Sequence, residues 1–259
     1  MKRLSAVSLL VFSTAIGWVP GGFAADFTRE EVVALLEAAK NKKPADLRRT
    51  NLDGLDLSGL DFRNSELWGA NLRKTNLSGS NLSGLNLDLT VMTAINLAGA
   101  DLSNSSIFGV YMVGANLSGA NLKGSRIISI LDKANLAKAD LSGANWGVDI
   151  KNQPMGQMRV SLKHANLSGA NLSDSDLNRA MLRFADLSGA TLKNTNLFRA
   201  ELAGADLTGA DLSGADLSEA KLESAKMAGA DLNGTKLLNI QGMIRGLDQA
   251  KNRDKAIVK

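Results

Sequence analysis

Acidic and amide side chains recur along this sequence at a regular spacing, and they are the first residues that suggest chemistry. Asp or Asn stands every five residues over long stretches, for example at Asp206, Asp211 and Asp216. Carboxylates at this density could serve as general acids or as calcium ligands. However, each one directly precedes an apolar residue, and the nine-residue glycine-aspartate repeat of calcium-binding solenoids is absent. We therefore expect these side chains to form hydrogen bonds in turns and ladders.

Other catalytic groups are scarce. The chain has 259 residues, one histidine and no cysteine. The histidine, His164, follows Leu162 by two residues, a position that favours an exposed corner over a general base. No phosphate-binding loop, cysteine nucleophile or zinc-ligand spacing occurs. The sequence predicts no catalytic residue, no metal site and no cofactor, so we do not expect an enzyme.

The elements that position these residues follow from the five-residue period. The stretch Glu201 to Leu222 reads ELAGADLTGADLSGADLSEAKL, with a leucine at every fifth residue. An α-helix advances about 100° per residue, so these leucines would point to every side of it. In a single strand, Leu202 and Leu207 would point to opposite faces because five is odd. Within one pentad, however, Ala205 and Leu207 can face the same way, which predicts an all-β solenoid of short straight sides joined by corners.

The repeat covers most of the chain. Its central apolar residues fall at 47, 52, 57 and onward to Ile127, slip by one residue to Leu131, and continue to Trp146. They resume at Leu162 and run to Leu237. The position two before the centre is usually Ala, Ser or Thr, and glycine is frequent two after it, where a corner benefits from a residue without a Cβ. We expect the repeat domain over 45–239, with an irregular insertion at 147–159.

At this point the sequence resembles the pentapeptide-repeat proteins, whose consensus is A-(D/N)-L-x-x. Copies include Ala70-Asn71-Leu72, Ala115-Asn116-Leu117 and Ala210-Asp211-Leu212. The resemblance implies a right-handed, four-sided (quadrilateral) parallel β-helix with twenty residues per coil. It implies little about function, although the best-understood members mimic DNA and protect or inhibit DNA gyrase.

Both ends of the chain differ from the repeat. Met1 to Ala24 has a basic start, an apolar run and small residues, which predicts a signal peptide cleaved after Ala24. Residues 25–44 are expected to form an N-terminal cap, with a capping box at Thr28 to Glu31 and a helix over 28–42. Residues 240–259 are expected to form a C-terminal cap and basic tail. This reading predicts a periplasmic or secreted protein with no stable membrane span after cleavage.

The distribution of charge argues against nucleic-acid mimicry. The chain carries a net charge of +4, whereas a DNA mimic needs a continuous acidic face. Glu201, Asp206, Asp211 and Asp216 lie on successive sides, so they would form a ring around the rod and not a stripe. A topoisomerase-directed DNA mimic is therefore only an alternative. A polysaccharide-binding β-helix is another, but it needs aromatic platforms for the sugars, and aromatic residues make up only 4% of the chain.

One region replaces polar outer residues with apolar ones. Stacking coils of twenty residues brings these outer positions onto two adjacent sides, which predicts an exposed patch for docking. Its residues are Trp68, Leu89, Val91, Phe108, Tyr111, Val113, Ile128 and Ile130. The insertion leaves the rod beside this patch. Either the insertion folds back and buries the patch, or the two together bind a partner; burial of Tyr111 and Val91 decides between these readings.

The sequence thus favours an exported structural or protein-binding rod. The protein partner is unknown, and no nucleic-acid partner is expected. An open edge at the C-terminal coil makes a homodimer possible there.

Overall fold

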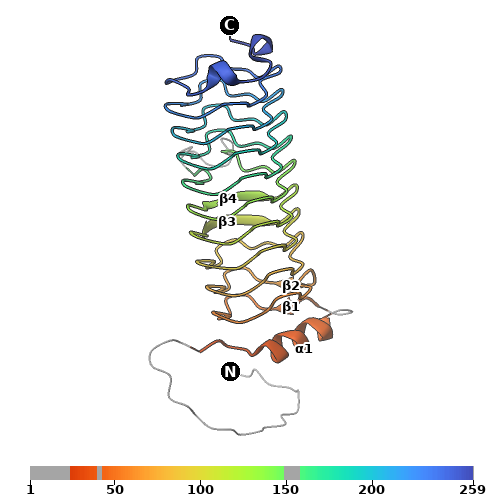
Figure 1. Ribbon diagram of the computed structural model, residues 1–259. Coiled ribbons are helices and arrows are strands. Elements are labelled where there is room, and N and C mark those ends of the chain that lie inside the picture. Colours follow the sequence, from red (N-terminus) through yellow and green to blue (C-terminus); the bar gives the residue numbers. More distant parts are fainter. Residues whose placement is uncertain (1–23, 40–42, 149–157, 259) are drawn as a thin grey trace, which may run out of the picture.

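The chain forms a rod of stacked coils (Figure 1). The computed structural model describes residues 24–39, 43–148 and 158–258. The expected signal peptide therefore lies outside the described residues except for Ala24, as do the last residues of the expected helix and most of the insertion. Parallel bridges join residues twenty apart, such as Asn76 to Asn96 and Asn96 to Asn116, and this register makes each coil four pentads long.

Four ladders of bridges run along the rod, and each defines an outer face. We name the faces A to D in chain order, and a corner takes the letters of the two faces it joins. The ladders include Asp46 and Glu66 on face A, Asn71 and Val91 on face B, Asn76 and Asn96 on face C, and Asn81 and Asp101 on face D.

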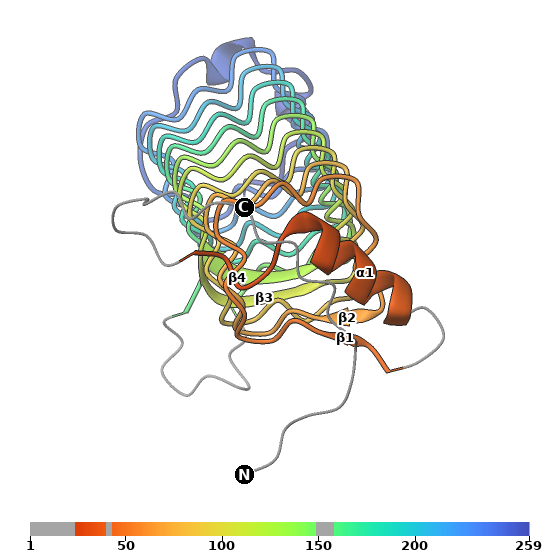
Figure 2. The ribbon, with the colours of Figure 1, turned by 90° about the horizontal axis from the view of Figure 1, so that it is seen from below.

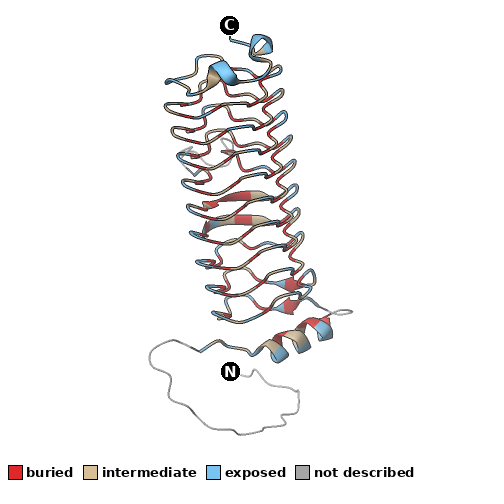
Figure 3. Cartoon of the chain, in the orientation of Figure 1, coloured by how far each residue is buried: buried red, intermediate tan, exposed pale blue. Residues whose placement is uncertain are grey.

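The core is a column of leucines with small residues beside it. Buried residues recur along the stacked coils (Figure 3). Leu187, Leu207 and Met227 stack on one another and are fully buried, as the five-residue period predicts. The Leu187 N–H donates to the carbonyl of Asp206, and the Leu207 N–H donates to that of Lys226. Coil stacking therefore satisfies the backbone while it buries the leucines, which is the reason the repeat folds at all.

The recurrent Asp and Asn side chains have the structural role expected for them. Asn96 Oδ1 accepts a hydrogen bond from the Ala98 N–H at 3.2 Å, which closes the turn. Asn96 Nδ2 donates to Asn76 Oδ1 at 2.9 Å, which joins two coils. One residue type thus stabilises both the corner and the stacking, so its place in the pentad is fixed.

A helix lies across the N-terminal end of the rod (Figure 2). It is α1 (Arg29–Ala39), and it begins with the expected capping box: the Thr28 N–H donates to Glu31 Oε2, and the Glu31 N–H donates to Thr28 Oγ1. Its buried face consists of Val32, Leu36 and Ala39. The Arg29 guanidinium donates to the carbonyls of Asp56 and Ser58 at 2.6 and 2.9 Å, so α1 is held to the first coil by packing and by hydrogen bonds.

Only four segments have the extent of named strands. They are β1 (Ala45–Asp46), β2 (Ser65–Glu66), β3 (Ser106–Tyr111) and β4 (Arg126–Ile130) among the described residues. β1 pairs with β2, and β3 pairs with β4, both in parallel. The β3–β4 pair crosses corner AB, and its register shifts between Phe108 and Tyr111 because β4 is one residue shorter. This shift is the one-residue slip that the sequence places before Leu131.

The C-terminal end departs from the expected boundary at 239. Bridges continue from Lys221 to Gln241, from Lys226 to Arg245, from Asp231 to Lys251 and from Lys236 to Ile257. The short 3₁₀ helices η1 (Leu247–Gln249) and η2 (Arg253–Lys255) replace ordinary corners. The expected basic tail is therefore a further coil, irregular in sequence but paired by its backbone. Among the described residues, no helix is both long and apolar enough to cross a membrane.

Candidate binding surface on face B

The structure places most of the predicted patch along face B and corner AB. Leu89, Val91, Tyr111 and Val113 are the exposed members, with 53%, 44%, 63% and 38% of their surface accessible. Trp68, Phe108 and Ile130 are half-buried. Val91, Tyr111 and Ile130 occupy ladder positions of face B, where face C carries asparagine in the same coils.

Ile128 was expected to be exposed, and this prediction is wrong. Its side chain is only 2% accessible. A regular corner has two residues, the second with left-handed backbone, but the segment from Ile128 to Ile130 is extended and has no such residue. Because one residue is missing, Ile128 belongs to a strand that continues past the corner and does not project from a turn.

A serine replaces the hydrogen bonds of the missing corner. Ser129 Oγ donates to the carbonyl of Ile107 at 3.0 Å and accepts from the Val110 N–H at 3.4 Å. Ser129 is itself buried, so both bonds are shielded from water. The two neighbouring coils therefore stay joined, and the flattened corner is a defined structural feature.

A pocket of about 280 Å³ lies on this flattened corner. It is lined by Gly109, Val110, Tyr111, Ile128, Ser129, Ile130, Met158, Arg159 and Met181. Met158 and Arg159 lie at the end of the insertion, so the insertion leaves the rod beside face B as the sequence predicts. Arg159 is fixed by a salt bridge to Glu201 at 3.0 Å. The pocket thus has an apolar floor with a cation at its rim.

The exposed fractions show which patch residues the described part of the chain covers. Val148, where the insertion begins, is 7% accessible, and Ile128 is buried as well. Tyr111 and Val91 nevertheless remain 63% and 44% accessible. The described residues therefore leave an apolar surface exposed here. Residues 149–157 of the insertion lie outside the described residues, so both interpretations of the insertion stay predictions.

Sequence reasoning missed two features of this region. Met181 occupies a face B ladder position above Ser161, where the repeat usually has a polar residue, and the same counting rule would have found it. Phe184 is 52% exposed at corner BC, and its ring stacks on that of His164 with centroids 5.1 Å apart. His164 is exposed at a corner as expected, and its partner there is an aromatic ring.

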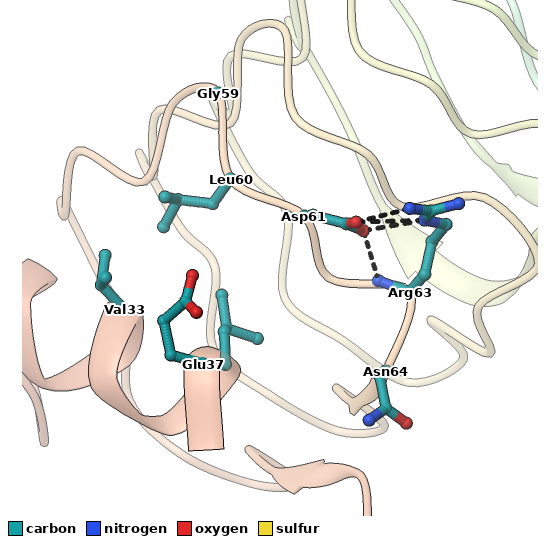
Figure 4. Close-up of a pocket in the computed structure, with 8 residues that line it drawn as sticks. Val33, Glu37, Gly59, Leu60, Asp61, Arg63 and Asn64 are labelled. Atoms are coloured by element: carbon teal, nitrogen blue, oxygen red, sulfur yellow. Dashed lines mark hydrogen bonds and ion pairs between the residues drawn. The ribbon is translucent and has the colours of Figure 1, made fainter. Parts of the chain in front are cut away.

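A second pocket, of about 540 Å³, lies between α1 and the first coils (Figure 4). Val33, Leu36 and Leu60 supply its apolar lining. Its polar rim includes Asp61 and Arg63, which form a salt bridge of 2.7 Å with each other. A straight helix laid on a four-sided coil leaves such a gap, and these two charges already satisfy one another. Face B is therefore the stronger candidate.

The acidic residues that could have formed a DNA-like face are distributed as a ring. Glu201, Asp206, Asp211 and Asp216 stand in four different ladders. In three of those ladders the next coil brings a lysine, with salt bridges of 3.9 Å from Lys221 to Glu201, 2.9 Å from Lys226 to Asp206 and 3.4 Å from Lys236 to Asp216. Asp211 instead pairs with Lys193 at 3.3 Å. The ring is compensated, which removes the acidic stripe that mimicry of DNA requires.

These contacts also lower the pKa values of two carboxyl groups in the ring, those of Asp206 and Asp216. Partial burial raises the pKa of Asp206, but hydrogen bonds from Thr208 and Lys226 and the charge of Lys226 lower it by more. The same balance holds for Asp216, where Ser218 and Lys236 supply the lowering contacts. Both pKa values lie below that of an ordinary aspartate, so both groups are ionised at neutral pH. No cluster of three potential metal ligands occurs among the described residues.

Comparison with known proteins agrees with the repeat. The family model for pentapeptide repeats matches in eight copies, over residues 45–69, 56–93, 86–124, 158–194 and 200–237. The chain therefore belongs to the pentapeptide repeat family. No curated protein matches it.

Several solved structures resemble the chain. HetL, a pentapeptide repeat protein involved in heterocyst differentiation regulation from Nostoc sp. strain PCC 7120, is 33% identical, with 83% of this chain and 94% of HetL covered and a TM-score of 0.43. Rfr23 from Cyanothece 51142 is 29% identical over 50% of this chain and 91% of its own, with a TM-score of 0.28. QnrB1, a plasmid-mediated fluoroquinolone resistance protein, is 19% identical, with 66% of this chain and 89% of QnrB1 covered and a TM-score of 0.30.

Proposed function

We propose that this protein is an exported, non-enzymatic rod that binds another protein through face B and corner AB. The observation that carries the proposal is the exposure of Leu89, Val91 and Tyr111 on a rod whose faces C and D carry polar ladders. Exposed apolar side chains on one side of a rigid scaffold are typical of a docking surface. The first 24 residues support export, because they have the pattern of a cleavable signal peptide.

The scaffold itself is part of the proposal. We infer a right-handed β-helix in which α1 serves as the N-terminal cap. Burial of Val32 and Leu36 against the first coil supports the role of α1, since an uncovered first coil would be an open edge. Asp26, which the expected cleavage retains, adds to this cover: its N–H donates to the Asn51 carbonyl, and its carboxylate accepts from the Asn51 N–H at 2.6 Å.

We also propose that the C-terminal end of the rod binds a second copy of the chain. The last coil exposes Met243, Ile257 and Val258, which are 77%, 43% and 62% accessible. Light scattering of the purified protein measures this association. A mass that stays monomeric at high concentration would reject the homodimer and leave the face B proposal untouched.

Crosslinking in the native compartment tests the docking surface. Wild type is compared with Tyr111→Asp and with Ala98→Asp, a control that adds the same charge at corner CD. Asp53, Asp88 and Asp132 already occupy the equivalent corner position, so Ala98→Asp should be well tolerated. We expect Tyr111→Asp to lose neighbours that both other forms capture. Identical neighbours for all three forms would contradict the proposal.

Export is tested separately. N-terminal sequencing of the protein from the periplasm or medium should begin at Ala25. Recovery of the intact Met1 form from the cytoplasm alone would reject export and revive the cytoplasmic alternative.

A further inference from the structure

The kind of partner that fits face B follows from where the partner's backbone N–H and carbonyl groups can find hydrogen-bond partners. Every residue of a rod face can offer an N–H and a carbonyl, but those of face B are used between coils. The Val91 N–H donates to the Ala70 carbonyl, and the Val91 carbonyl accepts from Leu72. Met181 is engaged in the same way with Val160 and Leu162. A strand added to this face would find no backbone partner, whereas an α-helix satisfies its own.

The apolar ladder has the length of a short helix. It runs along the rod through Val91, Tyr111, Ile130 and Met181, with Ser161 between the last two. Four coil steps at a strand spacing of about 4.8 Å give about 19 Å. A helix rises about 1.5 Å per residue, so about 13 residues, or between three and four turns, cover the ladder.

Charge is distributed unevenly beside this ladder. Corner BC carries the basic residues on one side of it. Arg73 and Lys74 lie in the coil before Val91, the corners at 93–94 and 113–114 are uncharged, and Lys133, Lys163 and Arg183 follow beside the last three coils of the ladder. Arg73 pairs with Asp53 at 2.6 Å. Beside the ladder the acidic residue at this corner is Asp132, which accepts hydrogen bonds from the Ser161 hydroxyl and the Lys163 N–H. Asp53 and Glu223 stand at the same corner beyond the two ends of the ladder. Among the described residues, no carboxylate forms a salt bridge with Lys74, Lys133 or Lys163.

The other side of the ladder is mainly apolar. Corner AB presents Leu89 and Phe108. Its cations beside the ladder are Arg159, which is paired with Glu201, and Arg179, whose carbonyl accepts a hydrogen bond from Arg159. Face B therefore offers an apolar strip with a row of cations along one edge. The complementary surface has an apolar stripe with carboxylates along one side of it.

We propose that face B binds an amphipathic α-helix of a partner protein, whose apolar stripe lies on the ladder and whose acidic flank meets corner BC. This inference rests on the proposed function, because it names the kind of partner that docks there. The row of cations fixes the direction of the helix, since reversing the helix would turn its acidic flank toward corner AB. Association should be faster and tighter at low salt, because the cations are exposed.

The test uses designed peptides and the full-length protein. The probe is a labelled helical peptide of about five turns, with leucines along one stripe and glutamates along one flank. Its controls carry lysine in place of glutamate, or a central proline that prevents the helix. Fluorescence anisotropy measures each affinity. We expect the glutamate helix to bind at least about tenfold more tightly than either control, and Tyr111→Asp to weaken it at least about tenfold.

A charge-reversal pair sharpens the result. Lys133→Glu with Lys163→Glu should weaken the glutamate helix about tenfold and strengthen the lysine helix. The matched control, Lys123→Glu with Lys138→Glu, makes the same change at corners DA and CD and should bind as wild type does. Equal effects of the two double variants would overturn the proposal, because binding would then follow net charge alone.

Two further outcomes are decisive. Binding to vesicles rich in phosphatidylglycerol without binding to the glutamate helix would overturn the proposal in favour of a membrane surface. If crosslinking in the native compartment depends on Tyr111 while the glutamate helix fails to bind, the proposed function stands and the helical partner is rejected.

Discussion

Faces C and D differ from faces A and B although all four enclose the same core. On faces C and D the ladders run without interruption from the first coil to the last. Face C has Asn at five consecutive positions and mostly Ser-Gly or Ala-Gly corners. Face B instead carries apolar residues such as Val91 and Tyr111 in its ladder, corner AB carries Leu89 and Phe108, and between faces A and B lie the flattened corner and the insertion. The difference shows that the outer positions are free to vary once the inner leucine is kept.

The flattened corner shows how far this freedom extends. β4 lacks one residue, and the bridges beyond it join Asn116 to Asn135 and Asn121 to Asp140, nineteen residues apart. The core nevertheless continues through Leu131 and Leu136, both fully buried. A deletion on faces A and B is thus absorbed without any change to faces C and D. This separation is the reason to look for function where the repeat is broken.

The largest expected effect on stability tests whether the core behind faces A and B is equivalent to the core behind faces C and D. Leu182→Ala removes a core side chain behind face B, and Leu207→Ala removes one behind face C; both leucines are fully buried. Each change should cost about 2–5 kcal/mol in the free energy of unfolding, because a cavity remains. Urea unfolding followed by circular dichroism measures both. If Leu182→Ala lowers the free energy of unfolding by less than about 1 kcal/mol, the core behind face B is not equivalent to the core behind face C.

A smaller effect compares two corners of the same coil. Gly204 at corner BC and Gly209 at corner CD have left-handed backbone, with φ of 71° and 67°. Alanine at either position should cost about 1–2 kcal/mol for that conformation. At Gly204 the added Cβ would also lie 2.4 Å from the Phe184 ring, whereas at Gly209 it meets nothing within 4 Å.

Gly204→Ala should therefore be the worse variant, by up to about 1 kcal/mol, since Phe184 must leave its stack on His164. Thermal unfolding of both variants measures the difference. Adding Phe184→Ala to each variant should abolish it. A difference that persists would place its cause outside the aromatic stack.

What the sequence predicts well is whatever the five-residue period enforces. The stacking of Leu187 on Leu207, the slip before Leu131 and the capping box of α1 all follow from residue types at fixed spacings. Ile128 was misplaced because counting assumes two residues at each corner, and one is missing there. The last coil was missed because its ladder positions after Gln241, which are Arg245, Lys251 and Ile257, no longer keep the five-residue period although their backbone still pairs. The exposed fraction of Tyr111 depends on the tertiary packing around face B, which no local sequence pattern encodes.

The charged ring predicts that stability depends on pH through its aspartates on faces A and C. The pKa of Asp206 and that of Asp216 lie below the ordinary value, so their contribution to stability is complete above the unfolded-state pKa, about 4. It is lost as the pH falls through the lower folded-state values. Asp206→Asn with Asp216→Asn should therefore be less stable than wild type at pH 7, by about 0.2–1 kcal/mol per pair, and the gap should close toward pH 2.

Urea unfolding at a series of pH values measures this gap. Asp186→Asn is the control, because Asp186 stacks against the carboxylate of Asp206 and not against a lysine. Removing the charge of Asp186 should not lower the free energy of unfolding at pH 7. A gap between wild type and the double variant that stays constant from pH 7 to pH 2 would show that the lysines do not act through ionised aspartates.

The smallest expected effect on stability is at the docking surface itself. Tyr111 is 63% exposed, so Tyr111→Asp should change the free energy of unfolding by less than about 0.5 kcal/mol. Ala98→Asp should do the same on the opposite side of the rod. Thermal unfolding of both variants therefore has to precede any binding experiment. If Tyr111→Asp unfolds well below Ala98→Asp, Tyr111 helps to hold the flattened corner together, and lost capture of a partner would report a damaged rod. If the two unfold together, lost capture is an effect of the surface alone, and faces C and D are the inert half of the molecule.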